Sequence, residues 1–271
     1  MKSLPTGIFI PGDSPIHRLD SSIKLLALFI TVVTIVLVNS FLGYVIMILF
    51  IMMIAMLSGI SLPVALNATN KLYWFFIIIL LMNTFFYSPE DAWFSFWVFT
   101  PSMTGFTYGL TVVLRVFLAL VISNILTSTT PPMEITHALE HLISPFSYVG
   151  IPTGQIAMIL SIAIQFIPTL AEETDTIRKA QMTRGARFDS KKITQKAEAV
   201  LPMVIPIFLA AFKRADELSV AMEARGYRGV SGRTKKSSRP LLVGDYGALL
   251  IVLLVCLLQI ALRLINLTRT Y

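Results

Sequence analysis

The sequence predicts an all-α, polytopic helical membrane protein with about five transmembrane helices and a cytoplasmic domain of long amphipathic helices. Of its 271 residues, 55% are hydrophobic and only 14% are charged, whereas soluble proteins carry about 25% charged residues. The mean hydropathy is +0.76. The apolar residues come in long runs rather than in alternation with polar ones, which favours membrane helices over strands.

The first apolar region, residues 22–57, is almost unbroken. A single helix of that length would be about 54 Å long, nearly twice the ~30 Å hydrocarbon core of a bilayer. We therefore expect two short spans that turn near Val38-Asn39-Ser40. The stretch "SGISLPVALNATNK" at 58–71 is predicted to be a polar connection.

Three further spans are predicted, at 72–87, at about 106–127 and at about 243–265. Residues 88–105, between the first two of these, contain Glu90, Asp91, Trp93 and Trp97 but no Lys or Arg. An outer loop with interfacial aromatic residues has this composition.

The segment 128–240 differs from the rest of the chain. Its apolar runs at 156–168 and 199–212 are each followed by a charged stretch with helical spacing, which indicates long amphipathic helices. A sixth span at 156–168 remains an alternative. The predicted domains are thus 1–127, an N-terminal cytoplasmic segment and four transmembrane helices; 128–240, the cytoplasmic helices; and 241–271, the C-terminal transmembrane helix.

The charge distribution predicts the orientation in the membrane. The net charge is +7, and residues 172–239 alone hold 15 basic and 8 acidic residues, also +7. Basic segments stay on the cytoplasmic side, so we expect 128–240 and the N-terminus inside and 88–105 outside. Nucleic-acid binding is disfavoured because the basic residues lie among acidic ones without interleaved aromatics.

One eight-residue pattern occurs twice. Residues 180–187 read "AQMTRGAR" and residues 221–228 read "AMEARGYR", both of the form A-x-x-x-R-G-x-R. Arg followed by Gly is typical of a helix end, where Gly takes the left-handed cap. The repeat also favours a second interpretation, in which Arg184 and Arg225 bind two equivalent receptors, since Arg suits bidentate contacts with carboxylate or carbonyl groups.

Other candidate sites are weaker. His137, Glu140 and His141 form an H-x-x-E-H pattern that could bind zinc. No third ligand is evident in the sequence, so an amphipathic helix starting at Thr130-Pro131-Pro132 is the favoured interpretation. Arg115, inside the fourth span, could snorkel, pair with Glu90 or Asp91, or line a solute path. The single Cys256 excludes a disulfide framework, and the sequence has no G-x-x-x-x-G-K-[ST] phosphate loop.

The chain resembles the transmembrane T component (EcfT family) of energy-coupling factor (ECF) importers. "FIPGDSPIHRLDSSIKLL" (9–26) looks like the family's N-terminal motif, and "TSTTPPMEITHALEHLISPF" (127–146) looks like its cytoplasmic entry after the fourth span. "QFIPTLAEETDTIRKAQMTRG" (165–185) and "LPMVIPIFLAAFKRADELSVAMEARGYRG" (201–229) look like its two coupling helices. Thr183 stands where the family usually has Ala.

The resemblance implies a non-catalytic scaffold in a bacterial cell membrane, an ABC transporter subunit for uptake of vitamins or other micronutrients. Its partners would be two ABC ATPases, which bind the ATP and Mg²⁺, and a membrane-embedded S component that binds the solute; the chain itself would need no cofactor. The ATPase-docking residues would be Arg184 and Arg225, supported by Gly185, Gly226, Ala180, Ala221, Ala224 and Thr183. The alternatives are a stand-alone secondary transporter or channel, and an intramembrane metalloenzyme.

Overall fold

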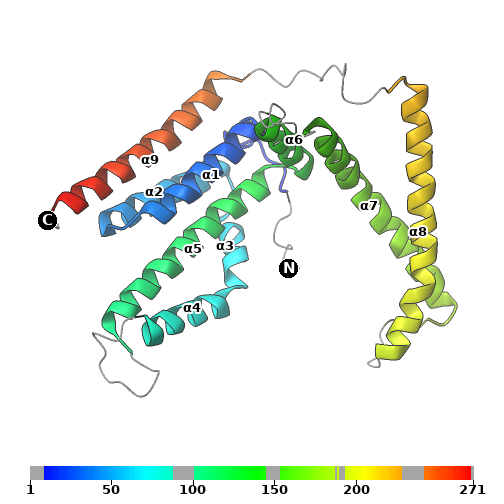
Figure 1. Cartoon of the computed structure of the whole chain (residues 1–271), viewed down its shortest axis with the longest axis horizontal. Coiled ribbons are helices and arrows are strands. Elements are labelled where there is room, and N and C mark those ends of the chain that lie inside the picture. Colours follow the sequence, from blue (N-terminus) through cyan, green and yellow to red (C-terminus); the bar gives the residue numbers. More distant parts are fainter. Residues whose placement is uncertain are drawn as a thin grey trace. The chain divides into compact units, whose positions relative to one another are not determined.

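The computed structural model describes residues 9–87, 101–144, 153–186, 188, 193–227 and 241–269. The regular secondary structure of these residues is α-helical (Figure 1), as the sequence predicts. The chain divides into two compact units: Met1–Ala138 with Arg239–Tyr271, and Leu139–Ser238. We call them the membrane unit and the coupling unit. Of the predicted outer loop at 88–105, residues 88–100 with Glu90 and Asp91 lie outside the described residues, and residues 103–105 already belong to a helix.

The helices of the membrane unit lie close to the predicted spans. They are α1 (Ser21–Leu37), α2 (Phe41–Ser58), α4 (Tyr73–Phe86), α5 (Met103–Thr129) and α9 (Val243–Arg269). α5 packs against α1, α2, α3 and α4, and α9 packs against α1. By length and composition, α2, α5, α7 and α9 could each cross a membrane, and α1 and α4 are shorter apolar helices. The possibility of a span at 156–168 therefore stays open.

Side-chain caps fix where these helices begin. Asp20 accepts a hydrogen bond from the Ser22 backbone N–H (2.8 Å), and Ser40 accepts one from Gly43 N–H (3.1 Å). Both satisfy donors that the first helical turn leaves unpaired. The predicted turn at Val38-Asn39-Ser40 is confirmed, because α1 ends at Leu37 and α2 begins at Phe41.

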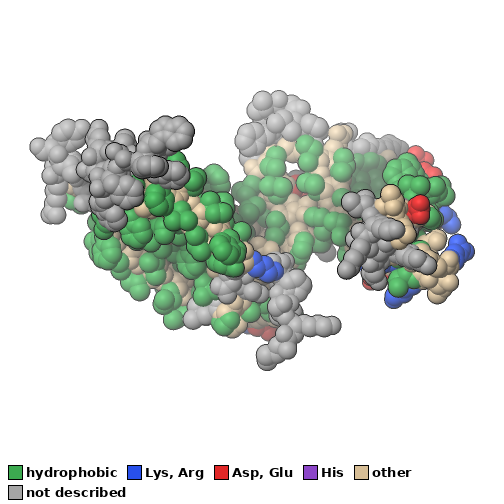
Figure 2. Space-filling view, turned by 90° about the horizontal axis from the view of Figure 1, so that it is seen from below, with side chains coloured by type: hydrophobic (Ala, Val, Ile, Leu, Met, Phe, Trp, Pro, Cys, Tyr) green, Lys and Arg blue, Asp and Glu red, His purple; other side chains and the backbone are tan. Residues whose placement is uncertain are grey.

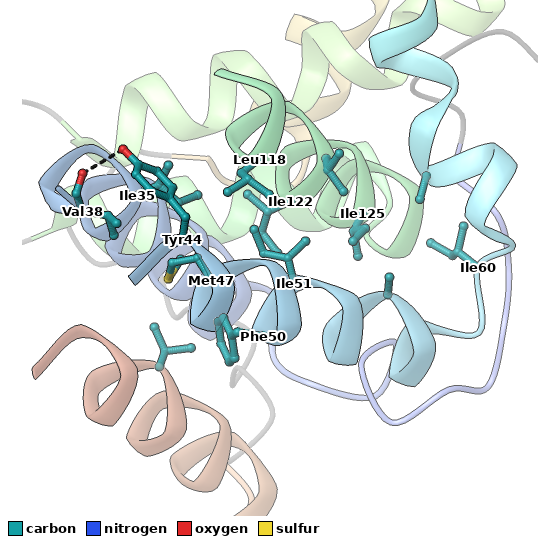
Figure 3. Packing of buried hydrophobic residues seen from close by; sticks show 14 residues of the cluster. Ile35, Val38, Tyr44, Met47, Phe50, Ile51, Ile60, Leu118, Ile122 and Ile125 are labelled. Carbon is teal, nitrogen blue, oxygen red and sulfur yellow. Dashed lines mark hydrogen bonds between the residues drawn. The ribbon is translucent and has the colours of Figure 1, made fainter. Parts of the chain in front are cut away.

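The core of the membrane unit lies where α1, α2 and α5 meet (Figure 3). Its least exposed members include Ile35, Met47 and Ile125, which are 2% exposed or less. α9 joins this core through Val252 and through Gln259, whose side-chain amide donates to the Gly43 carbonyl (3.0 Å). A Cβ at Gly43 would lie 2.7 Å from the Gln259 Oε1, so a larger residue at this position would have to displace the Gln259 side chain.

The predicted polar connection at 58–71 joins α2 to α4 and has regular structure that the sequence did not indicate. It contains a short helix, α3 (Leu62–Asn70), which has a proline in its first turn. Asn124 of α5 donates hydrogen bonds to the carbonyl groups of Val64 and Ala65 (both 2.9 Å). The tertiary contact with α5 stabilises this helix, although Asn and Thr in its sequence favour a loop.

The coupling unit consists mainly of two long helices, α7 (Thr153–Thr183) and α8 (Ile193–Ala224). The prediction that each apolar run continues into its charged stretch as one helix is confirmed. Prolines lie inside both helices, Pro168 in α7 and Pro202 and Pro206 in α8. In Figure 2, hydrophobic side chains dominate the visible face of the membrane unit, whereas charged ones gather on the coupling helices.

A shorter helix, α6 (Pro132–Ile143), contains the H-x-x-E-H pattern and begins at Pro132, as the amphipathic-helix interpretation expects. Within the described residues, no group of three or more His, Cys, Asp or Glu side chains is placed to hold a metal ion.

Candidate functional site

The first Arg-Gly pair ends α7 in a Schellman motif. The Ala186 backbone N–H donates to the Gln181 carbonyl (3.0 Å), and Gly185 N–H donates to Met182 (3.0 Å). Gly185 adopts a φ of +91°. This is the left-handed conformation that completes the motif, and it satisfies carbonyl groups that the last helical turn leaves unpaired.

The second pair ends α8 in the same way. Tyr227 N–H donates to the Met222 carbonyl (3.0 Å) and Gly226 N–H donates to Glu223 (2.9 Å), with a φ of +73° at Gly226. The hydrogen bonds fall at equivalent positions of the two repeats. Arg184 and Arg225 are therefore both the C-cap residue, the last before the glycine turn. The helix-cap interpretation of the repeated motif is confirmed for the backbone.

The side chains of the two arginines take no part in the backbone caps. Arg184 and Arg225 are both exposed, and within the described residues neither makes a side-chain hydrogen bond or ion pair. An extra Cβ at Gly185 or Gly226 would meet no atom within 4 Å. Each helix end thus offers a rigid backbone turn with an unobstructed guanidinium group, which suits bidentate contacts with a partner protein.

Small residues surround both arginines. Ala180, Thr183, Ala221 and Ala224 are all exposed on the last turns of their helices. The Thr183 hydroxyl donates back to the Ala180 carbonyl (2.7 Å), so it is already satisfied within α7. Thr183 therefore adds little bulk and no free donor where the resembling family usually has Ala.

The two helix ends lie at opposite ends of an antiparallel helix pair (Figure 1). Tyr227, just after α8, donates its hydroxyl to the Met158 sulfur near the start of α7 (3.3 Å). Arg184 follows the other end of α7, so that about 39 Å of helix separates it from Met158. A single small receptor could not contact both arginines at once.

Comparison with known proteins identifies the family. Residues 12–236 match the model of the CbiQ family, described as cobalt transport protein. The chain is 41% identical over 235 residues to the energy-coupling factor transporter transmembrane protein EcfT of Acidaminococcus fermentans, covering 87% of each chain. It is 39% identical to an EcfT protein of Listeria monocytogenes (87% of this chain, 88% of the relative) and 36% identical to that of Clostridium kluyveri (95% and 96%).

The chain belongs to the CbiQ/EcfT family. It is a multi-pass transmembrane component of energy-coupling factor transporters. The matched region runs from the N-terminal motif to beyond the second Arg-Gly pair, so both helix ends lie within what the EcfT family shares.

The N-terminal EcfT motif forms a network of polar contacts within the membrane unit. Lys24 of α1 donates its ammonium group to the carbonyl oxygens of His17 (3.1 Å) and Thr129 (3.4 Å). The His17 ring contacts the Ser14 hydroxyl (2.7 Å) and the Ile10 carbonyl (3.0 Å). The motif thereby joins the N-terminal segment, α1 and the end of α5.

Asp245 extends this network to α9. This carboxylate is 2% exposed and accepts hydrogen bonds from the backbone N–H groups of Asp20 (2.9 Å) and Leu242 (2.8 Å). Sequence reasoning missed it. The signal was an acidic residue in the first turn of an otherwise apolar span, where a buried charge must find partners.

Arg115 has partners that the sequence did not suggest. Its guanidinium donates to the Val38 carbonyl (2.7 Å), to Asn39 Oδ1 (2.7 Å) and to the Tyr44 hydroxyl (2.9 Å). The Tyr44 hydroxyl in turn donates to Val38 (2.9 Å; Figure 3). Arg115 thus stabilises the turn between α1 and α2. These hydrogen bonds give the side chain a structural role that differs from the snorkelling and the solute path considered from the sequence.

Proposed function

We propose that this chain is the coupling subunit of an ECF-type importer. In this proposal Arg184 and Arg225 each dock on one of two ABC ATPases, and the coupling unit transmits the ATPase motion to a membrane-embedded S component that binds a vitamin or another micronutrient. The chain binds no cofactor itself, because ATP and Mg²⁺ belong to the ATPases. The observation that carries the proposal is that the same helix C-terminal motif, with an exposed arginine before the glycine, occurs at two opposite ends of the α7–α8 pair.

The test is co-purification of the ATPases with variants of the full chain. Losing a desolvated, charge-assisted contact costs about 2–5 kcal/mol, so Arg184→Ala or Arg225→Ala would weaken its dock by roughly 30-fold or more. We expect each single variant to weaken the complex and the double variant to release both ATPases. Arg→Lys restores binding only in part, since Lys lacks the planar fork.

Lys213→Ala provides the matched control, because Lys213 is also a positively charged, exposed residue of α8 and forms an ion pair with Glu217 on the same helix. It should leave the complex intact. A folded double arginine variant that retains both ATPases and normal uptake would contradict the docking assignment.

The dependence of solute uptake on partner subunits distinguishes the coupling subunit from the stand-alone transporter. The purified chain alone should hydrolyse no ATP and move no solute, and both activities should appear when ATPases and an S component are added. Uptake by the chain alone in vesicles would favour the stand-alone carrier.

The proposed orientation places the N-terminus and residues 128–240 in the cytoplasm. It rests on the basic excess of 172–239. Cysteine introduced at position 235, in a variant with Cys256 replaced, should react with a membrane-impermeant reagent only from the cytoplasmic side. Labelling only from outside would contradict this orientation.

A further inference from the structure

An ion pair joins the two coupling helices at a point beyond the midpoint of each. Arg214 Nη2 of α8 lies 2.9 Å from Glu173 Oε2 of α7, and the two side chains are 31% and 30% exposed. The Glu173 oxygen itself is shielded from solvent and its contact with Arg214 lacks the alignment of a hydrogen bond. The contact is therefore electrostatic, at an atom that water does not reach.

The two partners occupy equivalent positions in the repeat. Arg214 follows Glu173 in the sequence by the same interval at which Arg225 follows Arg184. Each partner consequently precedes its own docking arginine by the same number of residues, which corresponds to about three helical turns, or about 16 Å. The ion pair therefore lies at equal distances along α7 and α8 from the two docking ends.

Contact between equivalent positions indicates local two-fold symmetry. When two copies of one motif pack about a two-fold axis, only residues beside the axis meet their own equivalents. The Tyr227–Met158 contact fits the same antiparallel register, because Met158 precedes Glu173 by nearly the same interval at which Tyr227 follows Arg214. The approximate axis of the pair therefore passes beside Glu173 and Arg214.

The charges suit this position. Identical charged residues at the axis would repel each other, whereas Glu on one helix and Arg on the other attract. The neighbouring charges Lys213 and Glu217, by contrast, lie within α8, 4.0 Å apart and 79% and 65% exposed. That pair is of the exposed kind that contributes little.

We propose that the Glu173–Arg214 ion pair is the pivot of the coupling helices, a pair of positioning residues that fixes the register and crossing of α7 and α8 and so sets the spacing between Arg184 and Arg225. The inference rests on the proposed function, in which these arginines dock on two ATPases. It assigns to Glu173 and Arg214 no contact with ATP, solute or ATPase. Their effect passes through the positions of the two helix ends.

Charge reversal and charge exchange test this role in the full transporter. Glu173→Arg or Arg214→Glu places like charges at the pivot, and we expect uptake per ATP hydrolysed to fall by about tenfold, within the range of coupling between contacting charges. The exchanged variant, Glu173→Arg with Arg214→Glu, restores the attraction and should recover most of the uptake. Lys213→Glu and the exchanged pair Lys213→Glu with Glu217→Lys are the controls and should change uptake little.

The spacing itself can be measured without any ATPase. Lys179 and Val220 are equivalent exposed positions, each just over one helical turn before its docking arginine. Spin labels on cysteines at these two positions, with Cys256 replaced by Ala, report the distance between the helix ends in the reconstituted chain. We expect one narrow distance distribution in the natural and exchanged proteins and a broadened or shifted one in each single reversal.

The two proposals fail separately. A docking failure would appear as ATPase binding that survives loss of both Arg184 and Arg225. The pivot is overturned if the single reversals leave the label distance and the uptake unchanged, or if the folded exchanged variant restores neither. Recovery of both by exchange supports the pivot, since a merely local packing role would not depend on the sign of the charges.

Discussion

The membrane unit and the coupling unit bury their apolar residues very differently. Met47 of α2 is fully buried, and the helices around it share a continuous core. In the coupling unit, Leu201 and Phe208 of α8 are 70% and 61% exposed, and among the described residues of α8 only Met203 is a buried hydrophobic. Both units carry many apolar residues, but among those that the structure describes, only the residues of the membrane unit form a buried cluster.

This difference in the burial of apolar side chains indicates which surroundings each unit requires. Exposed apolar residues on α2 or α9 can face lipid, and these helices also hold each other through buried polar contacts such as Gln259 with Gly43. α8 combines exposed apolar residues with charged ones such as Lys213 and Glu217. An exposed apolar surface of this kind is typical of a binding surface, so we expect lipid or protein outside the unit to cover it.

The largest expected effect tests the core directly. Met47→Ala leaves a cavity among α1, α2 and α5 and should reduce the free energy of unfolding by about 2–4 kcal/mol. Phe208→Ala removes a larger side chain that is already exposed and should change it by less than about 0.5 kcal/mol. Thermal unfolding of the detergent-solubilised chain measures both. Equal losses would show that the two units do not differ as described.

The next largest effect concerns the turn between α1 and α2. Arg115→Met removes three hydrogen bonds and leaves the Val38 carbonyl with fewer donors, so we expect a loss of about 2–4 kcal/mol. Tyr44→Phe removes the hydroxyl alone and should cost about 1 kcal/mol. The same unfolding measurement applies. If the two variants lost equal stability, the guanidinium would add nothing beyond the tyrosine hydroxyl.

Asp245 tests how α9 is anchored. Asp245→Asn places an amide nitrogen against one of two backbone N–H donors, and we expect a loss of about 1.5–3 kcal/mol. Asp13→Asn changes an exposed carboxylate of the N-terminal segment and should stay within about 0.5 kcal/mol. Protease sensitivity near α9 together with thermal unfolding would measure both variants. Equal stability and equal protease sensitivity of the two variants would contradict the conclusion that Asp245 anchors α9.

The smallest effect sharpens the description of the helix ends. Gly226→Ala forces a residue with a side chain to a φ of +73° and should destabilise the end of α8 by about 1–2 kcal/mol. Gly244→Ala, in a helix with open space around the added methyl, should instead stabilise α9 by about 0.5–1 kcal/mol. Hydrogen exchange of the Tyr227 amide reports the first variant, and faster exchange is expected. Unchanged exchange would mean that the Schellman bonds do not limit opening.

The sequence predicted the elements better than their contacts. Hydrophobic run lengths located α4, α5 and α9 and the turn at Val38-Asn39-Ser40, because the bilayer thickness and the rise of the α-helix together fix how many residues a span needs. The glycine turns after Arg184 and Arg225 followed from local backbone chemistry. α3 was missed because its stability comes from Asn124, which lies far beyond its last residue in the sequence.

Side-chain partners across helices were harder to predict. Arg115 could have paired with several groups, and only the packing of α5 against the turn selects Val38, Asn39 and Tyr44. The Glu173–Arg214 ion pair was not predicted, although the sequence contained a signal for it. The number of residues between Glu173 and Arg214 equals the number between Arg184 and Arg225. The sequence alone does not show which residues of α7 lie opposite which residues of α8, so this contact could be found only in the folded structure. ATPase docking and membrane orientation stay predictions.

The equal spacing of Glu173 and Arg214 from their helix ends has a mechanical consequence. Two forces applied in opposite directions at equal arms about a fixed point form a couple, which turns a body without translating it. With arms of about 16 Å on each side, a given movement of the two ATPases would rotate the coupling helices by a definite angle. Lengthening one arm by a helical turn would shift the midpoint between the two ends away from the ion pair. The same opposite movements of the ends would then displace the ion pair as well as rotate the helices.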